Sequence, residues 1–599
     1  MPLLPPTDLA REAKARLPRL TLAIIGLSIL LLVALSWPLV AGFLWPAAGR
    51  AASLALQLTS TPSPFQPSGT PSSTATLTLT PDPGAPFEAG GGDALSGTIL
   101  LSLSEQGYAQ LFWHRLAGEP FTRLTQGEWD DIHPAANPSN SLIAFASNRS
   151  GSWDLYLLDL QNGQTQQLSE DAAYDGHPSW SADGTWLAYE RNDSDNLEIY
   201  IRPADGSVEP VLISAHAALD YSPTWRPGRQ ELAFVSERSG LAQLWLVDLE
   251  AGGNRRFRQL APSEAAQAAP AWSADGDWLA WGQQEGGVWA IYVQDLSDRT
   301  SEPRRLGRGN NPQWNLSGSA LLAELQDATQ TYLTAYAIRG GLALAPEVLP
   351  GRLEGAAWAN YALGENLPPP LAAAARVTPV ADWLVAANEL ASGHTGSLDD
   401  VRAPYEELNQ SALAAFDALR EHTAQWLGWD ALSSLDNAYL PLGYLLPPDR
   451  QQDWLYTGRA FELHGALLEA GWMAAVREEF EGQSYWRIYL KAAEQAGGPG
   501  RPLTALPWDF SAHYLGGNDS ALAGGQQAAL APGGYWVDFT ALAAEYGFER
   551  VPALNNWRSY YHGALFNQFV LRAGLSWQEA MLQLYSAEDL SGILTTSSP

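Results

Sequence analysis

The stretch HPSWSADGTWLAYE, which begins at His177, contains the pattern that decides the fold: Pro-x-Trp, a tight turn with Asp-Gly, and an apolar strand. Related stretches begin at Ser222 (SPTWRPGRQELAF), Ala269 (APAWSADGDWLAWG) and Asn311 (NPQWNLSGSALLAEL). A degenerate copy begins at His133 (HPAANPSNSLIAF), with alanine in the place of tryptophan. Recurrence of one pattern in register indicates an internal repeat.

The aligned tryptophan slots set the period of the repeat. They are Ala136, Trp180, Trp225, Trp272, Trp314 and Trp358. Neighbouring slots are 42 to 47 residues apart, and each unit parses into four short strands separated by Gly- or Asn-containing turns. A period of about 40–45 residues with four strands per unit is typical of propeller blades. We expect the slot tryptophans to pack between blades, because a buried indole contributes a large apolar area.

The ends of the repeat array predict how the ring closes. Residues 97–125 supply three strands with no Pro-x-Trp strand before them, and residues 354–361 (EGAAWANY) supply a lone first strand. Joining the two completes one blade and removes exposed sheet edges. The sequence therefore predicts a six-bladed β-propeller over residues 97–362. His133 and His177 precede equivalent prolines, which places both on a rim of the ring as structural polar groups.

The repeat PSWSADGTWLAYERNDSDNLEIYIRPADG resembles those of TolB-type β-propellers, which are related to WD-repeat arrays. The resemblance covers residues 97–362, nearly half of the chain. In that family the fold mostly serves as a protein-interaction platform in the bacterial envelope. The resemblance therefore implies binding, and it transfers no catalytic residue.

Composition excludes several classes of function. The net charge is −31, and only 17% of residues are charged, which argues against nucleic acid as a partner because phosphate neutralisation needs clustered Lys and Arg. The chain has no cysteine, which excludes disulfides, thiol catalysis and Cys-ligated metal sites. We expect no cofactor and no metal.

The N-terminal segment is predicted to cross a membrane. Residues 20–46 form an apolar run long enough to span the hydrocarbon core. The positive residues of segment 1–19 precede this run, which places that segment in the cytoplasm and the body outside. The alternative is a cleaved signal peptide. Residues 47–96 are rich in Ser, Thr, Pro and Gly and are expected to form an extended stalk.

The C-terminal part has a different sequence pattern, typical of helices mixed with strands. A Pro/Ala linker is expected over residues 363–380, followed by an α+β domain over residues 381–599. Apolar residues at helical spacing follow Ala381 and Pro404, and strands are expected from Tyr485 and over GYWVDFTALAAEYGF from Gly534. A further helix is expected from Ser576. The domain contains no Gly-x-Ser-x-Gly, His-Glu-x-x-His or phosphate-binding Gly-Lys-Ser/Thr motif.

Residues 443–463 are similar to the Ser-x-His-x-x-Gly-x-Ala-x-Asp segment of zinc D-alanyl-D-alanine carboxypeptidases. Gly458 and Ala460 match that segment, whereas Asp453 takes the place of its serine and Leu455 the place of its first histidine. Zinc needs three protein donors, and the Leu455 side chain cannot donate.

The other two ligand positions of that family have also changed. Glu462 takes the place of the aspartate, and Gln568 takes the place of the second histidine. The resemblance thus implies a metal-free, inactive copy. If the domain is an enzyme nevertheless, the candidate site residues are Asp453, Glu462 and His464.

These observations predict a mainly β chain with an N-terminal transmembrane helix, a six-bladed propeller and a C-terminal α+β domain. The expected function is that of a membrane-anchored, extracytoplasmic binding or scaffold protein, with a non-catalytic C-terminal module in contact with the cell wall. The expected partners are envelope proteins or cell-wall components, and the cytoplasmic membrane through residues 20–46. The alternative is a cell-wall peptidase or hydrolase with its active site in residues 381–599.

Overall fold

The computed structural model describes Leu95 and residues 97–105, 107–116, 120–193, 195–364, 366–376, 394–495, 498–515 and 523–594. All of these lie within one compact unit, Ser72–Pro599. The predicted membrane helix, the predicted stalk apart from Leu95, and the expected helix after Ala381 fall outside the described residues. Within the described part, no helix combines the length and the apolar character needed to cross a membrane.

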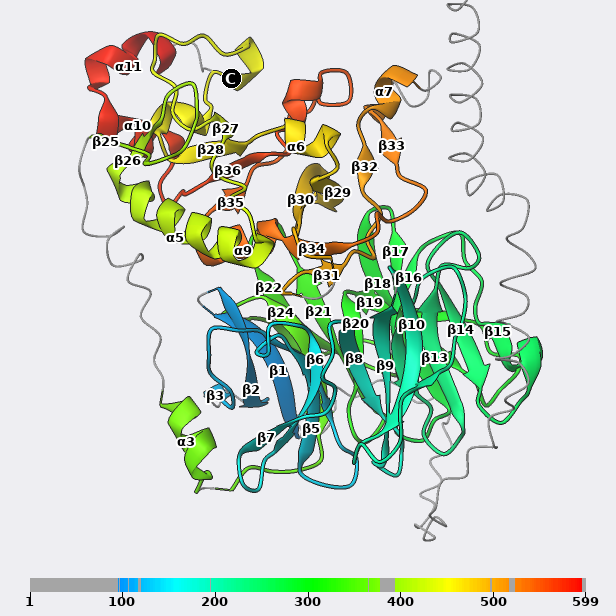
Figure 1. Ribbon diagram of the computed structural model, residues 1–599. Helices are drawn as coiled ribbons and strands as arrows, with labels where there is room; N and C mark the ends of the chain where they lie inside the picture. The colour runs from blue at the N-terminus through cyan, green and yellow to red at the C-terminus, as the bar shows by residue number, and fades with distance from the viewer. Residues whose placement is uncertain are drawn as a thin grey trace, which may run out of the picture. The chain divides into compact units, whose positions relative to one another are not determined.

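Six four-stranded antiparallel sheets follow one another in the described part of the propeller segment (Figure 1). Blade 1 consists of β4 (Asp131–Ala136), β5 (Leu142–Ser147), β6 (Asp154–Asp159) and β7 (Gln164–Gln167). Blade 2 consists of β8 (Tyr174–Trp180), β9 (Trp186–Asp193), β10 (Asn196–Pro203) and β11 (Val211–Leu212). Blade 3 consists of β12 (Asp220–Trp225), β13 (Glu231–Ser236), β14 (Gln243–Asp248) and β15 (Phe257–Gln259). Blade 4 consists of β16 (Gln267–Trp272), β17 (Trp278–Glu285), β18 (Val288–Asp295) and β19 (Arg304–Arg308). Blade 5 consists of β20 (Asn310–Trp314), β21 (Ala320–Gln326), β22 (Thr331–Ala337) and β23 (Leu342–Val348). Blade 6 consists of β24 (Leu353–Ala359), β1 (Thr98–Glu105), β2 (Tyr108–Arg115) and β3 (Thr122–Arg123).

Blade 6 combines strands from the two ends of the propeller segment. Strand β24 pairs antiparallel with β1, with Thr98 opposite Ala359 and Ile99 opposite Trp358. The predicted closure is therefore confirmed. Pairing β24 with β1 gives both strands a neighbour and removes two exposed edges from the ring.

The first strand of each blade carries the same backbone irregularity. In β8 the pairing register shifts between Gly176 and Ser179, and His177 has a φ of 45° directly before Pro178. Left-handed residues also precede the proline in blades 1, 3, 4 and 5, at His133, Ser222, Ala269 and Asn311. In blade 6 the corresponding residue is Gly355, with a φ of 143°. A β-bulge thus recurs at the Pro-x-Trp position of every blade, including blade 1, which lacks the tryptophan, and blade 6, which lacks the proline.

The slot tryptophans join neighbouring blades. The indole Nε1 of Trp180 donates a hydrogen bond to the carbonyl of Ala135 at 3.0 Å, one residue before the preceding slot. Trp314 donates to Ala271 O at 3.0 Å, and Trp358 donates to Gln313 O at 3.3 Å, in the same relative position. All of these indoles are buried. Each contact combines apolar burial with a satisfied polar group, so it fixes one blade against the next.

In its described residues, the C-terminal domain has two four-stranded sheets, in the orders β27-β28-β36-β35 and β29-β30-β34-β31, and the two-stranded sheets β25-β26 and β32-β33. Its strands are β25 (Thr395–Ser397), β26 (Glu407–Asn409), β27 (Leu435–Asn437), β28 (Ala460–Leu463), β29 (Met473–Phe480), β30 (Gln483–Lys491), β31 (Arg501–Pro502), β32 (Trp508–Asp509), β33 (Gln526–Gln527), β34 (Tyr535–Asp538), β35 (Glu549–Arg550) and β36 (Gln568–Val570). Its helices are α5 (Gln410–Leu427), α6 (Ala466–Glu469), α7 (Ala512–Leu515), α9 (Phe539–Glu545), α10 (Trp577–Leu584) and α11 (Ala587–Leu594). Buried aromatic rings, including Phe461 and Phe569, fill the core between these elements.

Two stretches differ from the sequence expectation. The strand predicted from Gly534 ends at Asp538, because the Asp538 side chain accepts a hydrogen bond from Ala541 N and caps helix α9. Within the predicted Pro/Ala linker, residues Pro369–Ala375 form helix α3. Proline suits the first turn of a helix, and Leu371 is buried in the core that includes blade 1.

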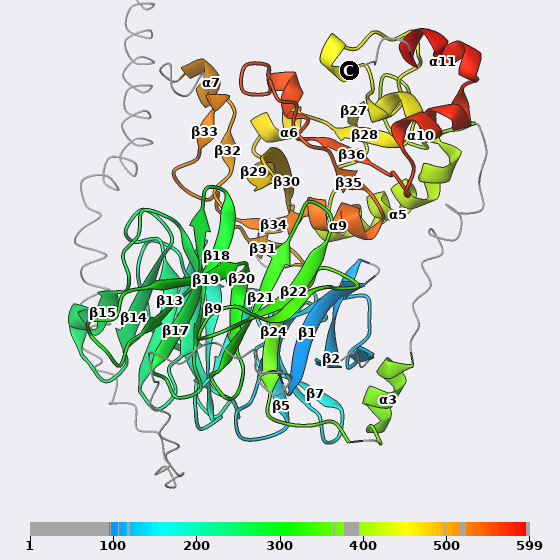
Figure 2. The same cartoon turned by 180° about the vertical axis from the view of Figure 1, so that it is seen from behind.

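The second sheet and α9 lie beside one end of the propeller in both views (Figures 1 and 2). Direct hydrogen bonds support this placement. Trp153 Nε1, before β6, donates to Pro499 O at 2.9 Å, and Tyr174 N, at the start of β8, donates to the Tyr535 hydroxyl at 3.3 Å. The propeller and the C-terminal domain are therefore in direct contact.

Candidate functional site

The candidate site is a cavity of about 1510 Å³ inside the propeller. Its wall includes the bulge residues that precede the Pro-x-Trp positions: His133, His177, Ser222, Ala269, Asn311 and Gly355. Residues of the C-terminal domain also line it, among them Arg487, Arg501 and Asp538. The inner strands of the ring and the C-terminal domain therefore line one common cavity.

Two histidines stack in the wall of this cavity. The rings of His133 and His177 have their centroids 3.4 Å apart and an interplanar angle of 25°. His177 Nδ1 lies 2.7 Å from Glu190 Oε1, which also accepts a hydrogen bond from the Tyr174 hydroxyl at 3.0 Å. The structure thus brings together the two histidines that the sequence placed at equivalent positions.

Burial and neighbouring charges keep His133 neutral and Glu190 ionised. Burial lowers the pKa of His133 well below its usual value, with further lowering from His177 and Arg501, so His133 is neutral. Burial opposes the ionisation of Glu190, but His177 and hydrogen bonds outweigh it and hold the pKa of that carboxyl below its usual value. An ionised Glu190 accepting from His177 Nδ1 fixes the orientation of the imidazole.

A second glutamate occupies the equivalent position on the opposite blade. Glu190 in β9 of blade 2 and Glu324 in β21 of blade 5 each follow the apolar run of the second strand. Blades 2 and 5 are three apart in a ring of six, so these carboxyl groups lie on opposite sides of the ring. Glu324 accepts a hydrogen bond from the Asn311 amide at 2.5 Å, and burial raises its pKa to about 7.

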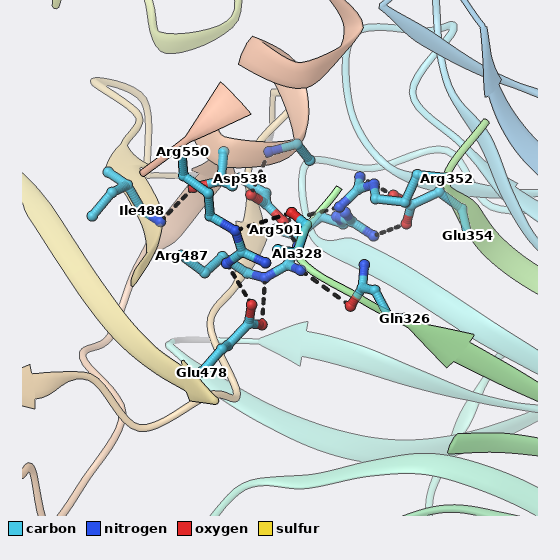
Figure 3. A network of polar contacts seen from close by, with 12 residues as sticks. Gln326, Ala328, Arg352, Glu354, Glu478, Arg487, Ile488, Arg501, Asp538 and Arg550 are labelled. Carbon is cyan, nitrogen blue, oxygen red and sulfur yellow. Dashed lines mark hydrogen bonds and ion pairs between the residues drawn. The ribbon is translucent and has the colours of Figure 1, made fainter. Parts of the chain in front are cut away.

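A network of ion pairs joins the cavity wall to the C-terminal domain (Figure 3). Arg352 of the propeller pairs with Asp538 at 2.9 Å and with its neighbour Glu354. Arg501 pairs with Glu354 at 3.1 Å, and Arg487 pairs with the same Asp538 oxygen at 2.9 Å. Asp538 therefore holds one guanidinium from each domain.

The network continues toward blade 5. Glu478 binds Arg487 at 2.7 Å and Arg550 at 2.5 Å. Arg487 also donates to the Gln326 side chain at 3.2 Å, and Arg550 donates to Ala328 O at 3.5 Å. Gln326 and Ala328 belong to the propeller, so these arginines cross the domain boundary.

The core of this network is buried. The side chains of Asp538 and Arg550 are 7% and 6% exposed, whereas Arg352, Arg501 and Glu478 are partly exposed. Burial raises the pKa of Asp538, but Arg487 and Arg352 outweigh it and bring it to about 2. Removing one partner from a buried pair leaves an uncompensated charge at a cost of about 3–5 kcal/mol. The network thus specifies one arrangement of the two domains.

The predicted enzymatic candidates do not converge on one site. Asp453 and Glu462 both bind Arg450, at 2.7 and 2.6 Å. His464 instead pairs with Asp436 at 2.7 Å, and its side chain is 46% exposed. The described residues contain no group of three or more His, Asp and Glu side chains placed to hold a metal ion.

The positions compared with a zinc site nevertheless lie together. Glu462 and Gln568 face each other across β28 and β36, and the Gln568 amide donates to Asp453 Oδ1 at 2.6 Å. Arg450 lies between the two carboxylates, so a guanidinium supplies the positive charge that they require. Leu455 is fully buried and packs in a separate apolar cluster with Tyr456 and Met581.

Sequence reasoning missed the interdomain network entirely. Its arginines, Arg352, Arg487, Arg501 and Arg550, stand in unrelated local contexts, with no spacing that connects them. Local signals were limited to ion pairs, such as Arg450 with Asp453 at an i, i+3 spacing and Arg352 with Glu354 two residues apart, and they do not indicate a contact between domains.

The comparisons with known proteins concern the propeller. A family model described as the TolB beta propeller domain matches residues 93–212 and 155–362. The Protein TolB homolog of Chlorobium luteolum is 33% identical over 160 residues, which cover 26% of this chain and 35% of that protein. The Tol-Pal system protein TolB of Desulfosudis oleivorans is 27% identical over 107 residues, which cover 18% of this chain and 24% of that protein.

Among solved structures, TolB from Acinetobacter baumannii aligns with a TM-score of 0.40 and 20% identity, over 44% of this chain and 67% of that chain. The chain spans about a third or less of the length of the two curated relatives. The family match and the sequence relatives both fall on the repeat. Residues 97–362 are therefore a TolB-like β-propeller segment.

Proposed function

We propose that this chain is a membrane-anchored, extracytoplasmic binding protein whose propeller recognises a protein of the cell envelope. The observation that carries the proposal is the large cavity inside a TolB-like propeller segment. At about 1510 Å³ it exceeds the usual range for small-molecule pockets, about 300–1,000 Å³. A cavity of that size suits a segment of a protein chain better than a single small ligand.

The name of one relative supports the choice of partner. The Desulfosudis oleivorans relative is described as a Tol-Pal system protein, and we carry only the envelope setting to this chain. The anchor is proposed from the apolar run of residues 20–46 and the positive residues before it. The net charge of −31 repels anionic surfaces, which fits a body held away from the bilayer.

The C-terminal domain is proposed to be a non-catalytic module in contact with the cell wall. The carboxylates of its candidate site, Asp453 and Glu462, are both engaged by Arg450. A carboxylate neutralised by a buried guanidinium is a poor general base, because the ion pair must break before the oxygen can take a proton. This engagement supports binding over hydrolysis.

Affinity capture from solubilised envelope tests the proposal. Thr224→Arg and Gln313→Arg place bulky cationic side chains on cavity-lining positions of blades 3 and 5, whereas Ser207→Arg places the same side chain on an exposed outer turn. We expect the parent and Ser207→Arg to retain the same envelope protein and the two cavity variants to lose it. Equal capture by all four proteins would contradict recognition through the cavity.

A further inference from the structure

The contact between the two domains encloses a small void of about 30 Å³, roughly the space of one water molecule. Carboxylates from both domains line this void: Asp130 and Glu354 from the propeller, and Asp538 and Glu545 from the C-terminal domain. The lining also contains the guanidinium groups of Arg352 and Arg501.

The carboxylates fall into two kinds. Glu354 and Asp538 each pair with arginine. Asp130 accepts a hydrogen bond from Ala109 N at 2.7 Å. The backbone of Gly107, between β1 and β2, and the side chain of Ser104 in β1 act to lower the pKa of Glu545, but burial outweighs them. Within the described part of the chain, neither Asp130 nor Glu545 forms an ion pair, so the guanidinium groups that favour their ionised forms, those of Arg352 and Arg501, are more distant.

The surrounding charges do not balance when every group is ionised. We define the interdomain charge cluster as the carboxyl groups of Asp130, Glu324, Glu354, Glu478, Asp538 and Glu545 with the guanidinium groups of Arg352, Arg487, Arg501 and Arg550. Carboxyl groups outnumber guanidinium groups by two. Tyr108 faces Asp130 and adds no positive charge. The cluster is neutral when two of its carboxyl groups carry a proton. Burial raises the pKa of Glu324 to about 7, but Glu324 accepts a hydrogen bond from Asn311 and does not line the void. Asp130 and Glu545 are therefore the two carboxyl groups to consider at the contact itself.

We propose that the contact between the propeller and the C-terminal domain is proton-dependent: it is tight when Asp130 and Glu545 are protonated and loosens when both are ionised. Loosening would expose the part of the cavity wall that the second domain supplies. The proposal rests on the geometry of the contact and is independent of the identity of any partner.

The direction of the pH effect follows from the environments of the two groups. Burial, assisted by the negative charge of Glu354, raises the pKa of Asp130 to about 7 and that of Glu545 to about 7. Once separated, both groups return to ordinary values of about 4. The docked state therefore binds more protons between about pH 4 and 7, and docking weakens as the pH rises through this window.

The absence of cysteine from the chain makes a direct distance measurement simple. Ser239→Cys on the propeller and Leu530→Cys on the C-terminal domain are both exposed positions and accept spin labels on the detergent-solubilised full chain. We expect one narrow distance distribution at pH 5 and a broader one at pH 8. The docking constant should fall by at most about tenfold per pH unit for each of the two groups.

Matched variants test the assignment. Asp130→Asn with Glu545→Gln keeps shape and removes both charges, so this variant should give the narrow distribution at pH 5 and at pH 8. Glu237→Gln is the control, because burial also raises the pKa of Glu237 to about 7 but that group lines the cavity on blade 3, away from the void. The control should behave as the parent. A parent distribution unchanged between pH 5 and 8, or a double variant that still broadens, overturns the proposal.

Discussion

The indole of Trp153, in the propeller, donates a hydrogen bond to the backbone carbonyl of Pro499, in the C-terminal domain, at 2.9 Å. The donor is held on both sides, because Trp153 is 1% exposed and is buried in one cluster with Tyr174 of the propeller and Tyr535 of the C-terminal domain. The acceptor lies two residues before Arg501, the first residue of β31, and the Arg501 guanidinium lies 5.8 Å from the ring centroid of Trp153. One tryptophan thus holds the strand that carries an arginine of the interdomain charge cluster.

The slot tryptophans should differ in what their indole N–H contributes. Trp314→Phe removes the donor to Ala271 O and should lower the free energy of unfolding by about 1 kcal/mol, the usual net contribution of one hydrogen bond. Trp272→Phe is the control, since Trp272 Nε1 has no hydrogen-bond partner among the described residues. Denaturant unfolding measures both. Equal losses of stability would show that the hydrogen bond is irrelevant to blade packing.

Ring closure depends on β24. Deleting residues 354–361 removes most of this strand and leaves two open sheet edges, so the propeller should aggregate or melt well below the parent. The deletion also removes Glu354, so Glu354→Gln serves as the control for the loss of the ion pairs with Arg352 and Arg501. Differential scanning calorimetry measures both. A deletion variant that melts with the parent would refute the closure seen in the pairing of β1 with β24.

Topology is tested by a reporter. We expect residues 51–599 to lie outside the cytoplasm, because four positive residues in segment 1–19 precede the apolar run, whereas Arg50 is the one positive residue that follows it closely. A reporter that is active only in the cytoplasm should be silent when fused after Gly92. The same reporter fused before Leu20 is the positive control. Activity of the fusion after Gly92 would refute the proposed localisation.

Asp538 provides a pH-dependent stability test. Asp538→Asn should lower the free energy of unfolding at pH 7 by about 3 kcal/mol, because Arg352 and Arg487 lose their shared carboxylate. The folded pKa of Asp538 is about 2, below the usual value, so its contribution is present above about pH 4 and is lost as the pH falls toward 2. The difference between parent and variant should shrink over that range. Asp205→Asn, at a fully exposed carboxylate, is the control. A difference that stays constant from pH 7 to pH 2 would contradict the role given to the ion pairs.

The propeller could be predicted because its determinants are local and repeated. Pro178 and Trp180 set a bulge and an inter-blade contact within a few residues, and the pattern recurs at a fixed period. Helix α9 was missed because YWVDF has strand character throughout, whereas the switch depends on one side chain, Asp538, capping the helix. The interdomain charge cluster could not be predicted, since residues such as Arg352 and Asp538 meet only through the tertiary fold.

Metal binding and catalysis in the C-terminal domain can be tested directly. Arg450 supplies the positive charge between Asp453 and Glu462, so the protein as purified should contain less than stoichiometric zinc. It should also release no terminal D-alanine from peptidoglycan peptides, and a chelator should leave its melting temperature unchanged. Carboxylates without imidazole or thiolate bind zinc weakly.

Replacing the arginine provides the sharper test. Arg450→Ala leaves two buried carboxylates unpaired and should cost about 3–5 kcal/mol of stability, whereas Arg420→Ala, in the more exposed pair with Asp430, should cost about 1 kcal/mol or less. Because Asp453 and Glu462 with neighbouring amide oxygens form a hard-oxygen set, millimolar Ca²⁺ or Mn²⁺ should restore part of the loss in Arg450→Ala only. Equal losses in the two variants would refute a buried, charge-compensating role for Arg450. Tight zinc in the parent together with chelator-sensitive cleavage, abolished by Glu462→Gln, would establish the peptidase alternative instead.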